Sequence, residues 1–156
     1  MTSTPAVHIR RGSAADANVI TTFNIQMALE TELKKLDPYA VTAGVKAVLA
    51  DENKGVYFVA EREGRVVGQL MITHEWSDWR NGDIWWIQSV YVHPDFRKQG
   101  IFKILHAHTR DAALKSGAIM LRLYVEKDNQ RAQRVYRGLG LDTTHYLLME
   151  QDLPRE

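Results

Sequence analysis

The chain of 156 residues contains no cysteine. This absence excludes disulfide bonds, thiol nucleophiles and thiolate metal sites together, so any covalent catalysis would have to use another residue type. The sequence also lacks an excess of charge, because 20 Lys and Arg residues balance 19 Asp and Glu residues to a formal net charge of +1. That balance does not favour a nucleic acid or a membrane surface as a partner.

Long apolar runs are also missing. No stretch reaches the roughly 18 apolar residues that a membrane-spanning helix needs. The first five residues lack the charged and apolar regions of a secretion signal, so we expect a cytoplasmic protein. The length suits one domain over residues 1–156, and a composition of 45% hydrophobic and 25% charged residues is that of an ordinary globular protein.

A glycine-bearing turn between a strand and a helix is the most informative stretch. Residues 84–92 are β-branched and aromatic, which predicts a strand, and residues 101–116 carry apolar side chains at helical spacing. The first amides of a helix have no intrahelical acceptor and lie at the positive end of its dipole. Gly100 allows close approach of the backbone, and Arg97, Lys98 and Lys103 add positive charge. The turn therefore predicts a phosphate site.

Other interpretations of this turn differ in strength. A single glycine between a strand and a helix is also ordinary loop chemistry. A Walker loop is excluded because the turn lacks the second glycine and the hydroxyl that holds magnesium. A Rossmann fingerprint is excluded because only one of its three glycines is present.

The remaining chain predicts alternating helices and strands. Ser13 and Asp16 have the spacing of a capping box that begins a helix, and Glu63-Gly64 has the form of a hairpin turn. The crossover through the helix at 101–116 predicts one parallel strand pair in a mostly antiparallel sheet. Further predicted elements are a strand at 7–10, a helix at 41–50, strands at 56–60, 66–72 and 119–125, a short helix after Asn129, and a last strand at 141–153.

Two segments in a fixed order carry a resemblance to a known family. Residues 89–100 resemble a motif in which a strand precedes an Arg/Gln-x-x-Gly-x-Gly/Ala pyrophosphate loop. Residues 129–140 resemble the motif Asn-x-x-Ala-x-x-x-Tyr-x-x-x-Gly. Both motifs are typical of the GCN5-related N-acetyltransferases, the GNAT superfamily, and the resemblance is strongest over residues 84–149. The chain departs from the first motif at Phe102, where a small residue is usual; its side chain is expected to project away while its amide still donates.

The resemblance implies the fold and the cosubstrate. The implied fold class is α/β (α+β), with a mixed, mostly antiparallel sheet of six to seven strands, about four helices, and a splay between the fourth and fifth strands. Acetyl-CoA is expected in this splay. The residues implied to bind it, mostly through their backbone, are Val90, Val92, Lys98, Gln99, Gly100, Ile101, Phe102, Lys103 and Asn129. No metal is expected, and His106 and His108 are too close in sequence to share a helix face.

The implied activity is transfer of the acetyl group to a primary amine of a small molecule or peptide by direct attack. Tyr136 matches the family tyrosine that donates a proton or hydrogen bond to the departing sulfur. Without the motif, the shared helix face with Ala132 and Leu139 favours a Tyr136 that fills a helix–sheet contact over a catalytic one.

The general base and the acceptor site are less well determined. Some family members carry a carboxylate at the position of Gln88, and glutamine cannot accept a proton at neutral pH. A water chain or one of Glu30, Glu75 and Asp83 would then serve, although carboxylates of this kind are more often solvated surface groups. Acidic residues near the first helix end and clustered tryptophans suit a cationic ligand. The expected substrate-binding residues are Glu30, Trp76 and Gln88.

Alternative functions and partners follow from the same residues. Gln88 motivates a non-catalytic acyl-CoA-binding domain as an alternative, and O-acyl transfer is a second one. Arg131, Arg134 and Arg137 form a basic stripe, but without an excess of positive charge or a recognised motif we expect no nucleic acid partner. A homodimer is expected by analogy alone, because mixed sheet edges in this fold often pair between subunits.

Overall fold

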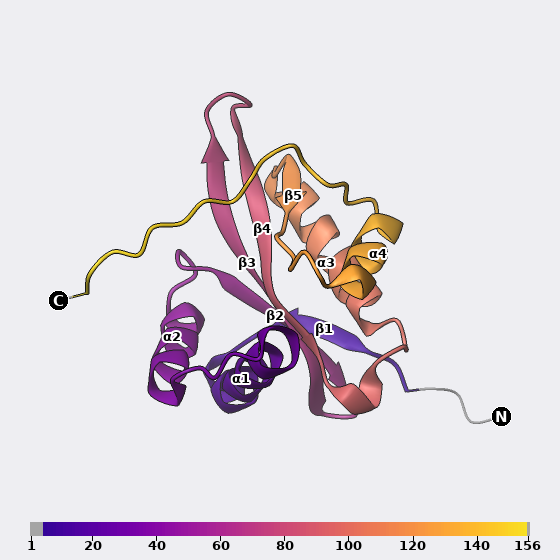
Figure 1. Ribbon diagram of the computed structural model, residues 1–156. Coiled ribbons are helices and arrows are strands. Elements are labelled where there is room, and N and C mark those ends of the chain that lie inside the picture. Colours follow the sequence, from indigo (N-terminus) through magenta and orange to yellow (C-terminus); the bar gives the residue numbers. More distant parts are fainter. Residues whose placement is uncertain (1–4, 156) are drawn as a thin grey trace.

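The computed structural model describes residues 5–155, and in this part of the chain one five-stranded sheet separates two pairs of helices (Figure 1). The strands lie in sequence order, antiparallel from β1 to β4, and β5 runs parallel to β4 as the crossover predicted. Their bounds are β1 (His8–Arg11), β2 (Val56–Arg62), β3 (Arg65–Ser77), β4 (Gly82–Val92) and β5 (Met120–Arg122).

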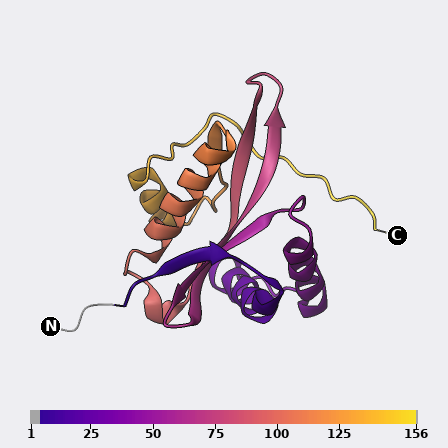
Figure 2. The same cartoon turned by 180° about the vertical axis from the view of Figure 1, so that it is seen from behind.

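The helices cover both faces of the sheet, as Figures 1 and 2 show from opposite sides. Helices α1 (Ala17–Glu32) and α2 (Pro38–Ala50) lie on one face, where Ile20 and Val45 pack against Val59. Helix α3 (Ile101–Ser116) lies on the other face with Leu105 against Leu70, and α4 (Gln130–Gly138) lies beside it. Two short 3₁₀ turns, η1 (Ala14–Asp16) and η2 (Pro94–Phe96), precede α1 and α3. None of the helices in residues 5–155 is long and apolar enough to cross a membrane.

Local sequence signals fix several of these boundaries. Glu63 and Gly64 adopt φ angles of 51° and 76°, as a two-residue hairpin turn between β2 and β3 requires. Helix α2 begins three residues before the predicted start, because the Asp37 side chain accepts a hydrogen bond from the Tyr39 amide at 3.0 Å and Pro38 occupies the first helical position. Helix α3 has the predicted bounds and ends at Gly117, whose φ is 86°.

The splay between the fourth and fifth strands is confirmed. Only residues 84–86 of β4 pair with β5, so residues 87–92 diverge from it. The fifth strand is also shorter than the predicted 119–125.

The predicted last strand over residues 141–153 is wrong. This segment, here called the C-terminal tail (residues 141–155), forms no ladder; its first residues lie near β5 and α4, and its last described residues end clear of the other elements (Figure 1). Leu147 and Met149 are 82% and 90% exposed. A strand-like pattern yields a strand only where an edge supplies hydrogen bonds, and the tail meets no edge of its own sheet. The described residues therefore contain five strands instead of six or seven.

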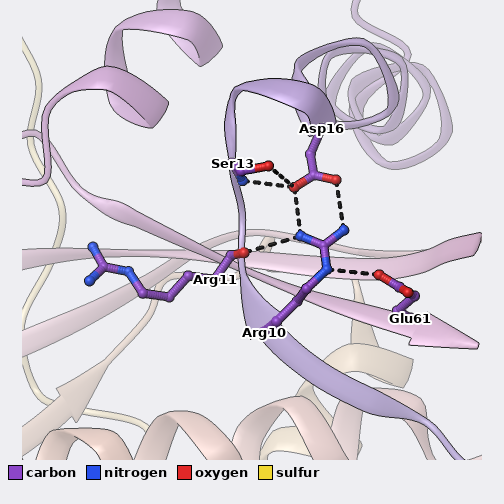
Figure 3. A network of polar contacts seen from close by, with 5 residues as sticks. All are labelled: Arg10, Arg11, Ser13, Asp16 and Glu61. Carbon is purple, nitrogen blue, oxygen red and sulfur yellow. Dashed lines mark hydrogen bonds and ion pairs between the residues drawn. The ribbon is translucent and has the colours of Figure 1, made fainter. Parts of the chain in front are cut away.

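A charged network attaches β1 to the start of α1 (Figure 3). The Arg10 guanidinium donates to both oxygens of Asp16 at 2.8 and 2.9 Å and to Glu61 on β2 at 2.7 Å. The Ser13 amide donates to the same Asp16 carboxylate at 2.7 Å, which is the expected capping bond. The hydrogen bonds from Arg10 lower the pKa of the buried Asp16 carboxyl, even though burial alone would raise it.

Replacing this carboxylate should destabilise the fold in a pH-dependent way. We expect Asp16→Asn to lower the free energy of unfolding by about 2 kcal/mol at pH 7, because Arg10 and Ser13 lose charge-assisted hydrogen bonds. A lowered folded-state pKa stabilises the fold above the ordinary value of 3.8 and stops doing so as the pH falls through the folded-state value. Urea unfolding at pH 7 and at progressively lower pH measures this difference, which should shrink in acid.

Glu52→Gln is the matched control, since Glu52 forms an exposed ion pair with Arg11 at 3.2 Å. It should change stability by less than about 0.5 kcal/mol. Equal losses for the two variants would contradict a special role for Asp16.

Candidate active site

A β-bulge interrupts β4 where it leaves β5. Gln69 pairs with Tyr91 but Met71 pairs with Gln88, so the single residue Leu70 opposes both Ser89 and Val90. Ser89 adopts a φ of 53°, which is uncommon for a residue other than glycine. A bulge of this kind bends the strand and redirects the groups that follow it.

A buried side-chain network holds this bulge in place. Gln69 on β3 is fully buried, and its Nε2 donates to the Ser89 carbonyl at 3.1 Å and to Asn24 Oδ1 on α1 at 2.9 Å. Asn24 Nδ2 in turn donates to the Tyr57 hydroxyl on β2 at 3.0 Å. Burial raises the pKa of Tyr57, so this hydroxyl remains protonated at neutral pH. The network therefore connects three elements to one carbonyl of β4.

The turn after β4 is tied to the end of α1 by Arg97. Its Nε donates to the Val92 carbonyl at 2.9 Å, its Nη2 donates to Glu30 at 2.7 Å, and its guanidinium lies 5.2 Å from the centre of the Tyr91 ring. The Tyr91 hydroxyl also donates to Glu30 at 2.9 Å, and burial followed by this bond raises the pKa of Tyr91. Arg97 was expected to add charge for an anion, but it instead fixes the shape of the turn.

Six successive backbone amides at this turn are unpaired within residues 5–155. The first hydrogen bond of α3 runs from the Ile104 amide to the Gly100 carbonyl at 3.1 Å, and no acceptor in that part of the chain meets the amides of residues 98–103. Lys98 and Gly100 both have left-handed backbone angles, with φ of 63° and 78°. Alternating backbone conformations that aim consecutive amides together form an anion-binding nest.

Tyr136 lies on α4 across a cleft from this nest. The cleft has a volume of about 1220 Å³ and is lined by the end of α1, residues 90–92 of β4, the turn, the start of α3 and the start of α4. The Phe102 ring meets the Tyr136 ring nearly edge-on, with centroids 5.5 Å apart. The side chain expected to project away from the turn therefore supports Tyr136.

The Tyr136 hydroxyl retains its proton and has no fixed partner. Burial raises the pKa of Tyr136, and none of the described residues hydrogen-bonds its hydroxyl. Asn129 caps α4 by accepting from the Ala132 amide at 3.1 Å, which leaves its own amide nitrogen available to donate into the cleft.

The structure brings most of the predicted site residues to this one cleft. Those that line it are Glu30, Val90, Val92, Lys98, Gly100, Ile101, Phe102, Asn129 and Tyr136. Four other predicted residues do not line the cleft. The Gln99 side chain accepts a hydrogen bond from Arg62, and Lys103 contributes only its backbone amide to the nest. Gln88 donates to Thr73 Oγ1 at 2.6 Å, and Trp76 is 64% exposed on the β3–β4 hairpin. No cluster of potential metal ligands occurs within the part of the chain that is described.

Each carboxylate considered as a base already has a cationic or ring-nitrogen partner. Glu30 pairs with Arg97 at 2.7 Å. Glu75 pairs with Arg122 at 3.1 Å and accepts from the Trp86 indole at 2.9 Å. Asp83 lies 3.0 Å from the His74 ring nitrogen.

Sequence reasoning missed the residues of the bulge network. Gln69 lies inside an otherwise apolar strand, and an isolated amide among buried apolar residues must find hydrogen-bond partners. That pattern in the sequence could have identified Gln69 as a member of a buried hydrogen-bond network. Nothing in the sequence indicated that Asn24, 45 residues earlier, would be one of those partners.

Removing the Gln69 amide should destabilise the bulge. We expect Gln69→Leu to lower the free energy of unfolding by about 2–4 kcal/mol, because the Ser89 carbonyl and Asn24 each lose a donor in a buried setting. Gln88→Leu is the control on the neighbouring strand; it removes one bond to Thr73 and should cost about 1 kcal/mol. Chemical denaturation of both variants makes the comparison, and a Gln69 loss no larger than the Gln88 loss would show that the network does not hold the bulge.

Several known proteins resemble this chain in sequence or structure. The family model "Acetyltransferase (GNAT) family" matches residues 22–141. A crystal structure of a possible acetyltransferase from Clostridium difficile 630 is 42% identical, covers 96% of this chain and 99% of that chain, and has a TM-score of 0.89.

Two further matches are more distant in sequence or shorter in extent. A predicted acetyltransferase from Clostridium acetobutylicum, solved with acetyl-CoA, has 18% identity and a TM-score of 0.79, with 94% of this chain and 96% of that chain covered. The thialysine N-epsilon-acetyltransferase of Bos taurus is 35% identical over 75 residues, which are 48% of this chain and 44% of that protein. The match thus spans less than half of that relative's length. Because the family model covers most of the sequence and the fold agrees with it, the chain belongs to the acetyltransferase (GNAT) family.

Proposed function

We propose that the chain is an N-acetyltransferase that moves the acetyl group of acetyl-CoA to a primary amine of a small molecule or peptide. The observation that carries this proposal is the placement of two features in one cleft. The unpaired amides of residues 98–103 border it, and Tyr136, whose hydroxyl has no hydrogen-bond partner among the described residues, lines the same cleft. An anion-binding site in the same cleft as a proton donor suits a reaction that releases a thiolate from a phosphate-bearing carrier.

The residues of the cleft fit acetyl-CoA. A diphosphate needs several convergent donors, and residues 98–103 offer six amides, with Gln99 and Lys103 contributing through their backbone. Among residues 5–155, no strand pairs with the β5 side of β4 beyond Trp86, so an extended pantetheine arm could run beside Val90 and Val92. Arg97 already occupies the Val92 carbonyl, which leaves Asn129 as a further side-chain donor. No metal is part of the proposal.

When bound, acetyl-CoA supplies an acetyl group activated as a thioester. Tyr136 donates its proton to the sulfur that leaves, and burial keeps that proton in place at neutral pH. The amine forms its bond to the acetyl carbon directly, so no enzyme nucleophile is needed, in keeping with the absence of cysteine. Because Glu30, Glu75 and Asp83 are paired and the Gln88 amide cannot accept a proton, we assign removal of the amine proton to water.

The acceptor in this proposal is a cationic amine. The Bos taurus relative is named for thialysine, which is an amine acceptor, and here Glu30 and Glu32 place carboxylates on the cleft rim at the end of α1. Gln88 and Trp76 lie outside the cleft, so only an acceptor that extends along the β3–β4 hairpin would meet Trp76. A cytoplasmic location, a single domain and a homodimer remain predictions of the same proposal.

A non-catalytic acyl-CoA-binding protein is the second candidate. The observation that favours it is the same pairing of all three carboxylates, together with the hydrogen bond that commits Gln88 to Thr73. Thiol release measured against a panel of amines and alcohols separates the candidates. Release with amines supports the proposal, release with alcohols alone supports O-acyl transfer, and coenzyme A binding without release supports the second candidate.

Removing the Tyr136 hydroxyl should slow turnover without weakening cosubstrate binding. We expect Tyr136→Phe to lower kcat by about 100-fold, the usual contribution of a general acid, while the Kd for coenzyme A changes less than about twofold. Tyr39→Phe, at a position on α2 that is 87% exposed, is the control and should leave both values unchanged. Normal turnover in a folded Tyr136→Phe protein would remove this residue from the mechanism.

A methyl group at Gly100 should weaken coenzyme A binding by altering the nest. A Cβ at this position meets no neighbouring atom, but a φ of 78° costs an L-residue about 1–2 kcal/mol. We therefore expect Gly100→Ala to raise the Kd for coenzyme A by about 10-fold as the turn relaxes. Gly44→Ala on α2, which also meets open space but has ordinary helical geometry, should bind normally. Titration calorimetry compares the two, and equal affinities would contradict a role for the turn conformation.

A further inference from the structure

Phe102 belongs to both of the features that meet in the cleft. It is the second residue of α3, its backbone amide is one of the six unpaired amides of the nest, and its side chain lines the cleft. Its ring meets the Tyr136 ring with centroids 5.5 Å apart and an interplanar angle of 70°. One residue therefore contacts the proposed proton donor and contributes to the proposed diphosphate site.

Helix α4 is attached mainly to its neighbours in sequence. None of its nine residues is buried. Within residues 5–155, the hydrogen bonds of its side chains and of its Asn129 cap reach only residues 126–143. The contact between Tyr136 and Phe102 instead joins α4 to α3, which packs on the sheet. A change at Phe102 is therefore expected to alter the position of Tyr136.

The Phe102 ring is itself held in place on α3. It packs against the core cluster that contains Ile101 and Leu105. His106 lies one helical turn later, is only 7% exposed, and has its ring centroid 6.3 Å from that of Phe102. Burial, followed by the charge of Arg110, lowers the pKa of His106, so its ring is neutral at pH 7 and packs without burying a charge.

A ring at position 102 also affects the surroundings of the Tyr136 hydroxyl. The pyrophosphate-loop motif usually has a small residue at this position, which would leave this side of Tyr136 open to water. Burial is the cause that raises the pKa of Tyr136. The ring that covers Tyr136 thus helps to keep its hydroxyl protonated.

We propose that Phe102 is a positioning residue for Tyr136. When the amides of residues 98–103 hold a diphosphate, the first turn of α3 is fixed, and the Phe102 ring that contacts Tyr136 is fixed with it. Phe102 thereby links binding of the cosubstrate to the placement of the proton donor, and His106 supports its ring. This inference rests on the proposed function.

Removing the ring should slow turnover and leave cosubstrate binding intact. We expect Phe102→Ala to lower kcat by about 10-fold, part of the loss expected for Tyr136→Phe, because a displaced proton donor is less effective. The Kd for coenzyme A should change less than about twofold, because the backbone amide of residue 102 remains. Leu114→Ala, at an exposed position on the same helix, is the control and should change neither value. A raised Kd with an unchanged kcat would show that the ring serves the cosubstrate instead, and would overturn the proposal.

A double-mutant cycle separates positioning from a general structural role. The Tyr136→Phe protein has no hydroxyl to position, so adding Phe102→Ala to it should lower the remaining kcat by less than about twofold. A loss of about 10-fold in both backgrounds would show that Phe102 does not act through the Tyr136 hydroxyl. That result would also overturn the proposal.

Tyrosine spectra test the contact without any turnover. In protein labelled at its six tyrosines, the signal missing from Tyr136→Phe identifies Tyr136. Phe102→Ala should shift this signal, because a neighbouring aromatic ring is lost, and should lower the pKa of Tyr136 toward its ordinary value of 10.0. The buried Tyr57 and Tyr91 should keep their signals and show that the variant is folded.

If the Tyr57 and Tyr91 signals move, Phe102→Leu, which keeps apolar volume without a ring, replaces the alanine variant in the same measurement. Leu114→Ala should leave the Tyr136 signal in place. An unchanged signal and an unchanged pKa for Tyr136 in the folded Phe102 variant would overturn the positioning role.

The two proposals fail separately, because the spectra need no cosubstrate. A protein whose Tyr136 responds to Phe102→Ala but that never releases thiol would overturn the enzyme alone. An active acetyltransferase whose Tyr136 does not respond would overturn the positioning role alone.

Discussion

The six amides at the start of α3 are the constraint on which the site depends. Unpaired backbone donors in residues 98–103 are tolerated only at a surface where water or a ligand satisfies them. Their arrangement requires left-handed angles at Lys98 and Gly100, and Arg97 holds the turn by bonding both Val92 and Glu30. The charge of Arg97 thus contributes to the shape of the site, while the amides offer the binding groups.

A second constraint lies one strand earlier. β4 diverges from β5 beyond Trp86, and the bulge at Ser89 redirects the backbone that borders the opening. Gln69, Asn24 and Tyr57 stabilise that irregular backbone from three different elements. The buried amide network and the solvent-facing amide nest are therefore parts of one arrangement: the first shapes the wall of the cleft, and the second lines its end.

The sequence predicted the structural features that local chemistry determines. It did not predict the features that depend on residues far away in the sequence. Glu63-Gly64, the α3 boundaries and the parallel β4–β5 pair followed from turn chemistry, helical spacing and crossover geometry. The strand predicted at residues 141–153 is absent because a strand pattern carries no information about which edge is available. The contact of Phe102 with Tyr136 and the partnership of Gln69 with Asn24 join residues 34 to 45 positions apart, and single-sequence spacing does not report such contacts.

The most direct test of the account follows the backbone amides themselves. Proton–nitrogen spectra of the labelled protein should be recorded with coenzyme A and, separately, with pantetheine, which lacks the diphosphate. The account predicts that coenzyme A shifts the amide signals of residues 98–103 and that pantetheine leaves them in place. Unchanged signals for these six amides at saturating coenzyme A would contradict the claim that they hold the diphosphate.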